Sequence, residues 1–236
     1  MASQASWDYL LNAVKKDDER LGVLCDWFFG ENLTSERLIE RCAEIAYKDL
    51  QRNLGGIGGT GDAAKVDAKD KFKVDVVAFI RARILLLLDM AFPKEPRERQ
   101  DAFDGWHQEA CEGIREIAGD INRYLEKEFS YGLAQKWLNM TLKNMLVAET
   151  AEWHKKLYKV KKLLHVPVDS YVIDAAQNGL GIRDEKRKNY PTTWSGWEYD
   201  VYDRFQKRVR EAVDRRDDYD CPMAWEFDAW IVAKNN

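Results

Sequence analysis

Apolar residues recur at intervals of three and four along almost the whole chain, which is the spacing that places them on one face of an α-helix. No stretch alternates apolar and polar residues for longer than four positions, so no β-strand is predicted. Capping residues, prolines and glycines mark the ends of the periodic segments. The predicted helices cover residues 6–16, 18–30, 35–54, 63–92, 97–127, 135–146, 153–164, 169–178, 199–214 and 223–232. We therefore predict an all-α protein.

The segment from Ala63 to Phe92 is the longest of these helices. It is amphipathic at first and almost entirely apolar from Val76 to Met90. A helix that is apolar on all sides is normally buried, so we expect it at the centre of the core. Arg81 and Arg83 interrupt the apolar run, and they either extend their charged ends outward or pair with a buried acid.

A glycine-rich segment, Gly55 to Asp62, separates residues 1–54 from residues 63–236. Its composition is that of a phosphate-binding loop, but it lacks a Gly-Lys-Ser/Thr motif and a preceding strand. We expect a flexible linker, with contact to a ligand as the alternative. The predicted organisation is two helical subdomains with a cleft between them: N-terminal helices at 1–54, a linker at 55–62 and a helical core at 63–236.

The stretch from Phe129 to Ala176 carries the residues that point to chemistry. Ser130 to Ala134 is predicted to form a tight turn, and the helix that follows places Lys136 in its first turn. A lysine there lies against the positive end of the helix dipole, which would ease its deprotonation for nucleophilic attack. Further on, Asp169 is a natural N-cap, and its carboxylate could stabilise positive charge or activate water. The alternative is that Lys136 is an ordinary surface lysine and Asp169 only a cap.

Two short motifs in this stretch resemble helix-hairpin-helix DNA glycosylases. Tyr-Gly-Leu-Ala-Gln-Lys, ending at Lys136, resembles their hairpin, roughly Pro-Gly-Val-Gly-Arg-Lys, and Pro-Val-Asp-Ser-Tyr-Val, around Asp169, resembles the segment of their catalytic aspartate. Asp169 follows Lys136 by 33 residues (169 − 136), which is similar to the archaeal 8-oxoguanine glycosylase branch. The chain departs from the family in two places, since Ala134 replaces the second hairpin glycine and the helix before it ends in a charged run, 126–128. The resemblance covers residues 129–176.

The resemblance implies a DNA N-glycosylase without a cofactor, which flips a modified or damaged base out of double-stranded DNA and excises it. Lys136 would be the nucleophile, with lyase activity if it attacks, and Asp169 the catalytic carboxylate. Gly132, Ala134 and Gln135 would belong to a hairpin, at 129–146, that holds a DNA phosphate. A general similarity to free-standing bacterial glycosylases that act on phage DNA extends the expectation to hypermodified bases and antiviral defence.

The charge of the chain gives a mixed indication for DNA binding. The formal net charge of −4 is unusual for a general nucleic-acid binder. Five lysines nevertheless gather between residues 151 and 168 against a single acid, and Lys155, Lys156 and Lys159 among them are the predicted DNA contacts. The alternative is an ordinary solvated helix face.

Four cysteines without CxxC spacing and three scattered histidines indicate no metal or iron–sulfur site. They are typical of free thiols in a reducing cytoplasm. The first residues do not form a signal peptide, and the longest apolar run, 84–88, is too short to cross a bilayer. We expect a cytoplasmic protein without a membrane partner, and the sequence does not indicate its oligomeric state.

Aromatic residues complete the candidate chemistry. Trp194 and Trp197 follow a polar loop, and they are predicted either to stack on a flipped base or to pack in the core. Trp106 is expected in the core, with His107 exposed beside it. Nine tryptophans and an acidic balance also suit protein recognition. The second hypothesis is therefore a non-catalytic helical adaptor or inhibitor, and a third is a glycosidase acting on RNA or nucleosides.

Overall fold

The computed structural model describes residues 34–55, 63–148, 152–184, 186 and 189–235. Every regular element within these ranges is a helix, so the prediction of an all-α protein is confirmed. The two helices predicted at 6–16 and 18–30 lie outside the described residues. No described helix is long and apolar enough to cross a membrane.

The α-helices are α3 (Ser35–Leu50), α4 (Ala63–Asp89), α5 (Pro96–Ile117), α6 (Gly119–Asn122), α7 (Tyr131–Val147), α8 (Glu152–Val160), α9 (Ser170–Gly179), α10 (Tyr199–Val213) and α11 (Pro222–Asn235). Three short 3₁₀ turns are η1 (Gln51–Asn53), η2 (Lys161–Leu163) and η3 (Trp194–Gly196). Most boundaries fall within a few residues of the predicted ones. The helix predicted at 97–127 is instead divided into α5 and α6, which meet at Ala118.

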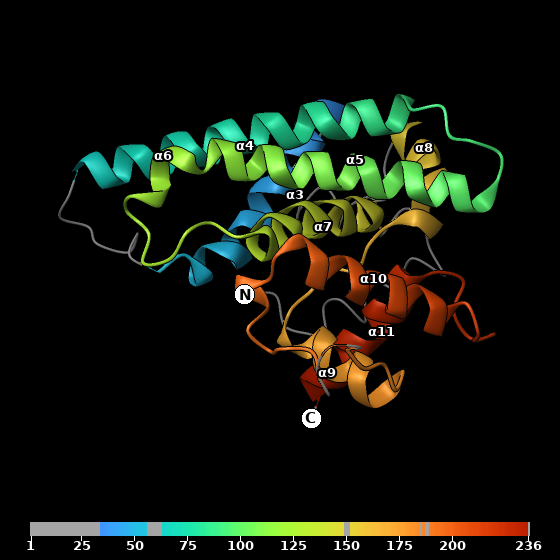
Figure 1. Cartoon of the computed structure of the whole chain (residues 1–236). Coiled ribbons are helices and arrows are strands. Elements are labelled where there is room, and N and C mark those ends of the chain that lie inside the picture. Colours follow the sequence, from blue (N-terminus) through green and yellow to red (C-terminus); the bar gives the residue numbers. More distant parts are fainter. Residues whose placement is uncertain (1–33, 56–62, 149–151, 185, 187–188, 236) are drawn as a thin grey trace.

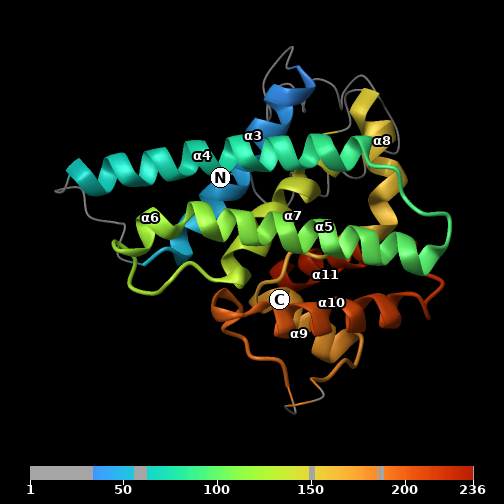
Figure 2. The same ribbon diagram turned by 45° about the horizontal axis from the view of Figure 1, so that its top comes forward.

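Helix α7 lies at the centre of the fold, between two layers of helices (Figure 1). α3 and α5 pack on one side of it, α4 packs on both of these helices, and both views show α4 and α5 side by side (Figure 2). η3 and α10 contact α7 from the other side, where α11 packs on α9 and α10. The predicted cleft between two subdomains is not confirmed, because α7 contacts both layers. α3 and α4, which flank the glycine-rich segment, share one hydrophobic core.

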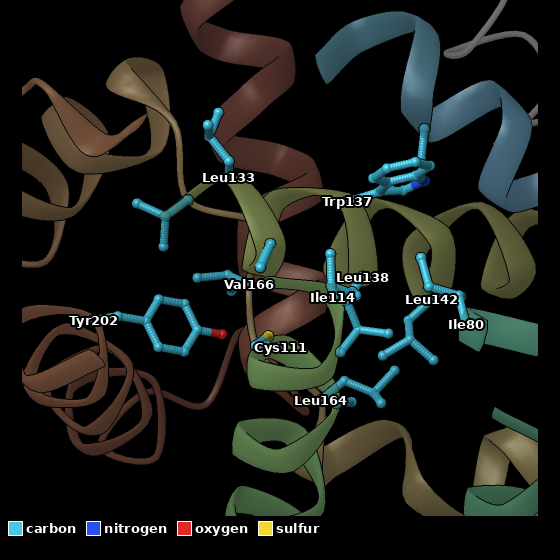
Figure 3. Close-up of a cluster of buried hydrophobic side chains, with 14 of the residues drawn as sticks. Ile80, Cys111, Ile114, Leu133, Trp137, Leu138, Leu142, Leu164, Val166 and Tyr202 are labelled. Atoms are coloured by element: carbon cyan, nitrogen blue, oxygen red, sulfur yellow. The ribbon is translucent and has the colours of Figure 1, made fainter. Parts of the chain in front are cut away.

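Helix α7 is buried on nearly every side. Its sequence predicts burial only for the broad apolar face. Trp137, Leu138 and Leu142 are fully buried and belong to the same core cluster as Ile80 of α4 and Ile114 of α5 (Figure 3). The polar side of the helix is buried as well, so its polar side chains must find partners inside the protein.

The start of α7 differs from the predicted tight turn at 130–134, because the helix already begins at Tyr131. Ser130 is its N-cap, and the Ser130 hydroxyl accepts a hydrogen bond from the Leu133 N–H at 3.2 Å. A Cβ on Gly132 would lie 2.0 Å from the carbonyl oxygen of Trp194. Glycine is therefore needed here so that η3 can approach the helix closely. The earlier start also places Lys136 in the second turn of α7, not in the first.

Helix α4 was expected to be buried on all sides, and this prediction is wrong. One side is buried, through Val76, Ile80, Ile84 and Leu87, whereas Leu86 in the middle of the apolar run is 61% exposed. Among the described elements, neighbouring helices cover only the inner side of α4, so its apolar composition exceeds what these helices bury. Its two arginines pair with acids of α3 and α5: Arg81 with Glu40 at 2.8 Å and Arg83 with Glu109 at 2.9 Å.

Candidate functional site

A lysine–aspartate ion pair joins α7 to the start of α9. Nζ of Lys136 lies 2.9 Å from Oδ2 of Asp169, although the two residues are 33 positions apart in the chain. Their side chains are 10% and 16% exposed, so the pair is largely buried and still touches solvent. The structure thus brings together the amine and the carboxylate that the sequence singles out.

An extended segment, residues 164–169, carries Asp169 to this position. Gln135 of α7 donates a hydrogen bond to the Val168 carbonyl and accepts one from the Val168 N–H, both at 3.2 Å. Gln206 of α10 does the same for Val166, at 2.8 and 3.1 Å. The two side-chain amides thereby satisfy buried backbone groups as a neighbouring β-strand would. The segment is clamped from two helices, which fixes Asp169 opposite Lys136.

Asp169 uses its two carboxylate oxygens for different partners. Oδ1 caps α9 by accepting a hydrogen bond from the Val172 N–H at 2.9 Å, and Oδ2 accepts from Lys136. Burial alone would raise the pKa of Asp169, but Lys136, the Val172 N–H and the charge of Lys143 outweigh it, so the pKa lies below its ordinary value. Asp169 is therefore ionised at neutral pH, as the predicted chemistry requires.

A second buried ion pair, which the sequence did not point to, lies farther along α7. Nζ of Lys143 lies 2.8 and 2.6 Å from the two carboxylate oxygens of Glu226 in α11, and these side chains are 10% and 2% exposed. The rings of Phe227 and Trp230 lie 4.4 and 5.5 Å from the same ammonium group. Lys143 shares the polar side of α7 with Lys136, which was the available signal, but no spacing links it to Glu226, 83 residues away.

The predicted phosphate-binding hairpin at Gly132, Ala134 and Gln135 is not confirmed. The Gly132 N–H donates to the Trp197 carbonyl at 2.8 Å, and the Ala134 N–H donates to the Ser130 carbonyl at 3.2 Å. All three predicted residues are buried. Since η3 covers this end of α7, its N–H groups satisfy the protein's own carbonyls, and Gln135 serves the Val168 clamp.

The predicted DNA-binding lysines lie on α8, which packs against α4 and α7. Lys156 is exposed and pairs with Asp89 at 2.5 Å, and Lys159 is exposed. The side chain of Lys155 lies outside the described residues. The Lys136–Asp169 pair lies instead between α7 and α9, and no described contact joins the α8 lysines to it.

The two tryptophans predicted to line a base pocket have different surroundings. Trp197 is 3% exposed, donates to the Pro191 carbonyl at 3.1 Å and packs on Phe205 with ring centroids 5.4 Å apart. It is a core residue, which agrees with the second of the two alternatives that the sequence left open for it. Trp194 is 9% exposed, and its ring lies 5.9 Å from Nζ of Lys136. Trp194 therefore forms part of the wall beside the ion pair.

A separate polar network lies in the core between α5, α7 and α10. His165 contacts Asp104 through Nε2 and Tyr202 through Nδ1, both at 2.8 Å, and Arg210 lies 2.9 Å from Asp104. Asn139 donates to the Tyr202 oxygen at 2.8 Å, and its own oxygen lies 2.8 Å from Nε2 of His107.

Burial fixes the protonation of this network. Burial lowers the pKa of His107 and of His165, in the second case against the opposing pull of Asp104. His165 is therefore neutral, and because an ionised carboxylate only accepts, Nε2 carries the proton and Nδ1 accepts from the Tyr202 hydroxyl. His107 was expected to be exposed, but it is fully buried. These polar groups satisfy one another away from solvent, so the network fixes the packing of three helices.

Among the described residues, no three His, Cys, Asp or Glu side chains lie together as a metal ion would require. No family model, no curated protein and no solved structure matches the chain.

Proposed function

We propose that the protein is a DNA N-glycosylase whose reacting groups are Lys136 and Asp169. One observation supports this most directly: the two residues singled out by the sequence lie 2.9 Å apart, one of them at the N-cap of the following helix. The substrate class would be DNA with a modified or damaged base, with a hypermodified base in phage DNA as one candidate.

In the proposed reaction, the ionised Asp169 stabilises the positive charge that develops on the sugar as the N-glycosidic bond breaks. The bonding electrons leave with the base, which takes up a proton. If Lys136 first gives up a proton, its nitrogen can form a bond to C1′, and opening of the sugar ring then gives a protonated imine. If Asp169 instead activates a water molecule, the product is an abasic site and no imine forms.

The proposal places a requirement on the surroundings of the pair. Lys136 and Asp169 are bonded to each other and are only 10% and 16% exposed. A nucleotide can therefore reach them only if part of the neighbouring wall moves aside. Trp194, the aromatic ring beside Lys136, is the residue whose displacement would open the pair to an extruded base.

The test is base release from double-stranded DNA that carries 8-oxoguanine, uracil or glucosylated hydroxymethylcytosine, followed by alkali and detection of strand breaks. We expect Asp169→Asn to reduce base release at least about 100-fold, because it removes the charge that stabilises the transition state. Borohydride would reduce a Lys136 imine and leave a covalent protein–DNA adduct, which Lys136→Gln should abolish.

Matched controls exist for both substitutions. Asp174→Asn changes an exposed aspartate of the same helix, whose carboxylate accepts a hydrogen bond from Asn178 at 2.9 Å. Lys94→Gln changes an exposed lysine in the turn between α4 and α5, which has no predicted role in DNA binding. Both should leave base release unchanged. Full activity of Asp169→Asn would overturn the catalytic assignment.

A non-catalytic binding function is the second candidate, and a separate observation favours it. The N–H groups predicted to hold a phosphate already bond to carbonyls within the protein, while α4 exposes large apolar side chains, including Val74 and Leu86. An adaptor or inhibitor would use such a face to bind another protein. A tight protein partner recovered in a pull-down, together with no base release and no binding to DNA, would favour this alternative.

A further inference from the structure

The outer side of α4 presents an apolar surface that no described element covers. Val74 and Leu86 are 65% and 61% exposed, and both belong to the few large hydrophobic side chains that are exposed in the described residues. Ala78 and Ala82, which lie between them, are exposed as well. The four residues follow one another at intervals of four, so they share one face of the helix. We call these four residues the α4 face.

The α4 face is symmetrical about position 80. Ala78 and Ala82 lie at equal distances on either side of this position, as do Val74 and Leu86. The same relation extends to charged residues, since Lys71 and Asp89 are also equally distant from position 80. An antiparallel copy of the helix would place Ala78 opposite Ala82, Val74 opposite Leu86 and Lys71 opposite Asp89. The lysine would thus meet an aspartate at both ends of the pair.

A groove lies at the Leu86 end of the face, between α4 and α5. It has a volume of about 370 Å³, and its apolar lining includes Leu86, Met90, Ala102, Gly105 and Trp106. In the antiparallel arrangement, Val74 of the second helix lies against this end. The groove would receive that side chain, and two alanines at the centre would let the helix backbones approach closely.

We propose that the protein forms a two-fold symmetric dimer in which α4 of one copy packs antiparallel against α4 of the other. A two-fold interface uses the same surface on both partners, so it requires a surface complementary to itself. The α4 face meets this requirement in shape, because small residues are central and larger ones lie toward the ends. It also meets this requirement in charge, because Lys71 of each copy lies opposite Asp89 of the other.

The charged residues at the ends have partners within the chain that can be exchanged. Nζ of Lys71 lies 2.5 Å from Asp75, and Asp89 lies 2.5 Å from Lys156. These are exposed ion pairs, which contribute little to stability, so a second carboxylate or ammonium group can join them at small cost. A single helix pair buries less than the interfaces of permanent complexes, so the dimer is concentration-dependent. The dimer does not depend on the proposed glycosylase activity.

Sedimentation velocity of the full chain, from low micromolar to several hundred micromolar, tests the dimer. We expect the wild-type protein to change from monomer to dimer over this range. Ala82→Glu places two like charges at the centre of the pair and should remain monomeric at every concentration. Thr192→Glu, which adds the same charge at an exposed position outside α4, should dimerise like the wild type.

A charge exchange tests the orientation. Lys71→Glu and Asp89→Lys should each weaken the dimer at least about tenfold, because each leaves like charges opposite one another. The double variant should recover the wild-type dissociation constant. Both substitutions are at exposed positions. This test still decides the question if Ala82→Glu fails to fold.

Disulfide formation gives a second measurement of orientation. The background for this experiment is Cys25→Ser, in which the remaining native cysteines 42, 111 and 221 are buried. Ala78→Cys and Ala82→Cys are introduced separately into this background, and the two proteins are mixed and oxidised. We expect mainly the mixed disulfide, because these positions face each other across the pair. A monomeric wild-type protein at the highest concentration, dimerisation of Ala82→Glu, or cross-links mainly between identical chains would each overturn the proposal.

Discussion

Replacing Asp169 separates two roles of one carboxylate, because each oxygen has its own partner. Alanine at position 169 removes both the α9 cap and the partner of Lys136. Asparagine keeps an oxygen that can accept from the Val172 N–H, and it is among the best N-cap residues. It cannot, however, neutralise the lysine. The two variants therefore report the cap and the ion pair separately.

The expected losses follow from these contacts. Loss of an N-cap costs about 1 kcal/mol. Removing one partner of a buried ion pair costs about 3–5 kcal/mol, and since Lys136 retains some exposure we take the lower end, about 3 kcal/mol. Asp169→Asn should thus reduce the free energy of unfolding by about 3 kcal/mol and Asp169→Ala by about 4 kcal/mol. Adding Lys136→Met to Asp169→Asn removes the unpaired charge and should recover about 2 kcal/mol.

Urea denaturation, followed by circular dichroism and tryptophan fluorescence, measures these differences. Coincident transitions by the two probes would establish two-state unfolding, and the midpoint then gives the change in free energy. Asp174→Asn on the exposed side of α9 is the control and should stay within about 0.5 kcal/mol of the wild type. Two results would contradict the assigned roles of Asp169: an Asp169→Asn variant as stable as the wild type, or a double variant less stable than Asp169→Asn alone.

Three further predictions follow from the described contacts. The pKa of Asp169 in the folded protein is below its unfolded value of about 3.9. Its contribution to stability is therefore complete above that pH and is lost as the pH falls through the folded pKa. In a pH series of urea midpoints, stability should fall less steeply toward acid pH for Asp169→Asn than for the wild type. Gly132→Ala should destabilise the fold by about 2 kcal/mol or more, because the added Cβ meets a backbone oxygen. Gly105→Ala has open space around its Cβ and should be neutral or slightly stabilising. Thermal unfolding at low protein concentration measures both variants. Tyr202→Phe should cost about 2 kcal/mol by urea denaturation, because it leaves the buried Nδ1 of His165 without a donor. Tyr199→Phe, at a less buried ring, should cost much less, and equal losses would contradict the assigned network.

Helical periodicity was sufficient to predict the all-α class and most of the helices, and the Pro-Val-Asp motif correctly predicts that Asp169 caps α9. The proximity of Lys136 and Asp169 was an expectation of the family resemblance, since nothing in local periodicity relates positions 33 residues apart. Their chemical role remains a proposal.

Other features depend on tertiary packing and could not be predicted from local sequence. Gly132 suggested a phosphate-binding turn, but the same small residue is needed wherever two backbones approach closely, and here the second backbone is η3. The apolar run of α4 indicated burial, but sequence composition does not tell how many sides of a helix find neighbours. Glu226 pairs with Lys143 from a distant helix, and no local signal identifies such a partner.

The double clamp on Val166 and Val168 has a consequence for how this sequence can change in length. The amides of Gln135 and Gln206 each match one backbone position of the extended segment, so inserting or deleting one residue between Leu164 and Asp169 would misalign at least one clamp. Variants of this protein that gain or lose residues should therefore keep the length of 164–169 constant. Changes in length would be accommodated elsewhere, as in the polar loop between α9 and η3.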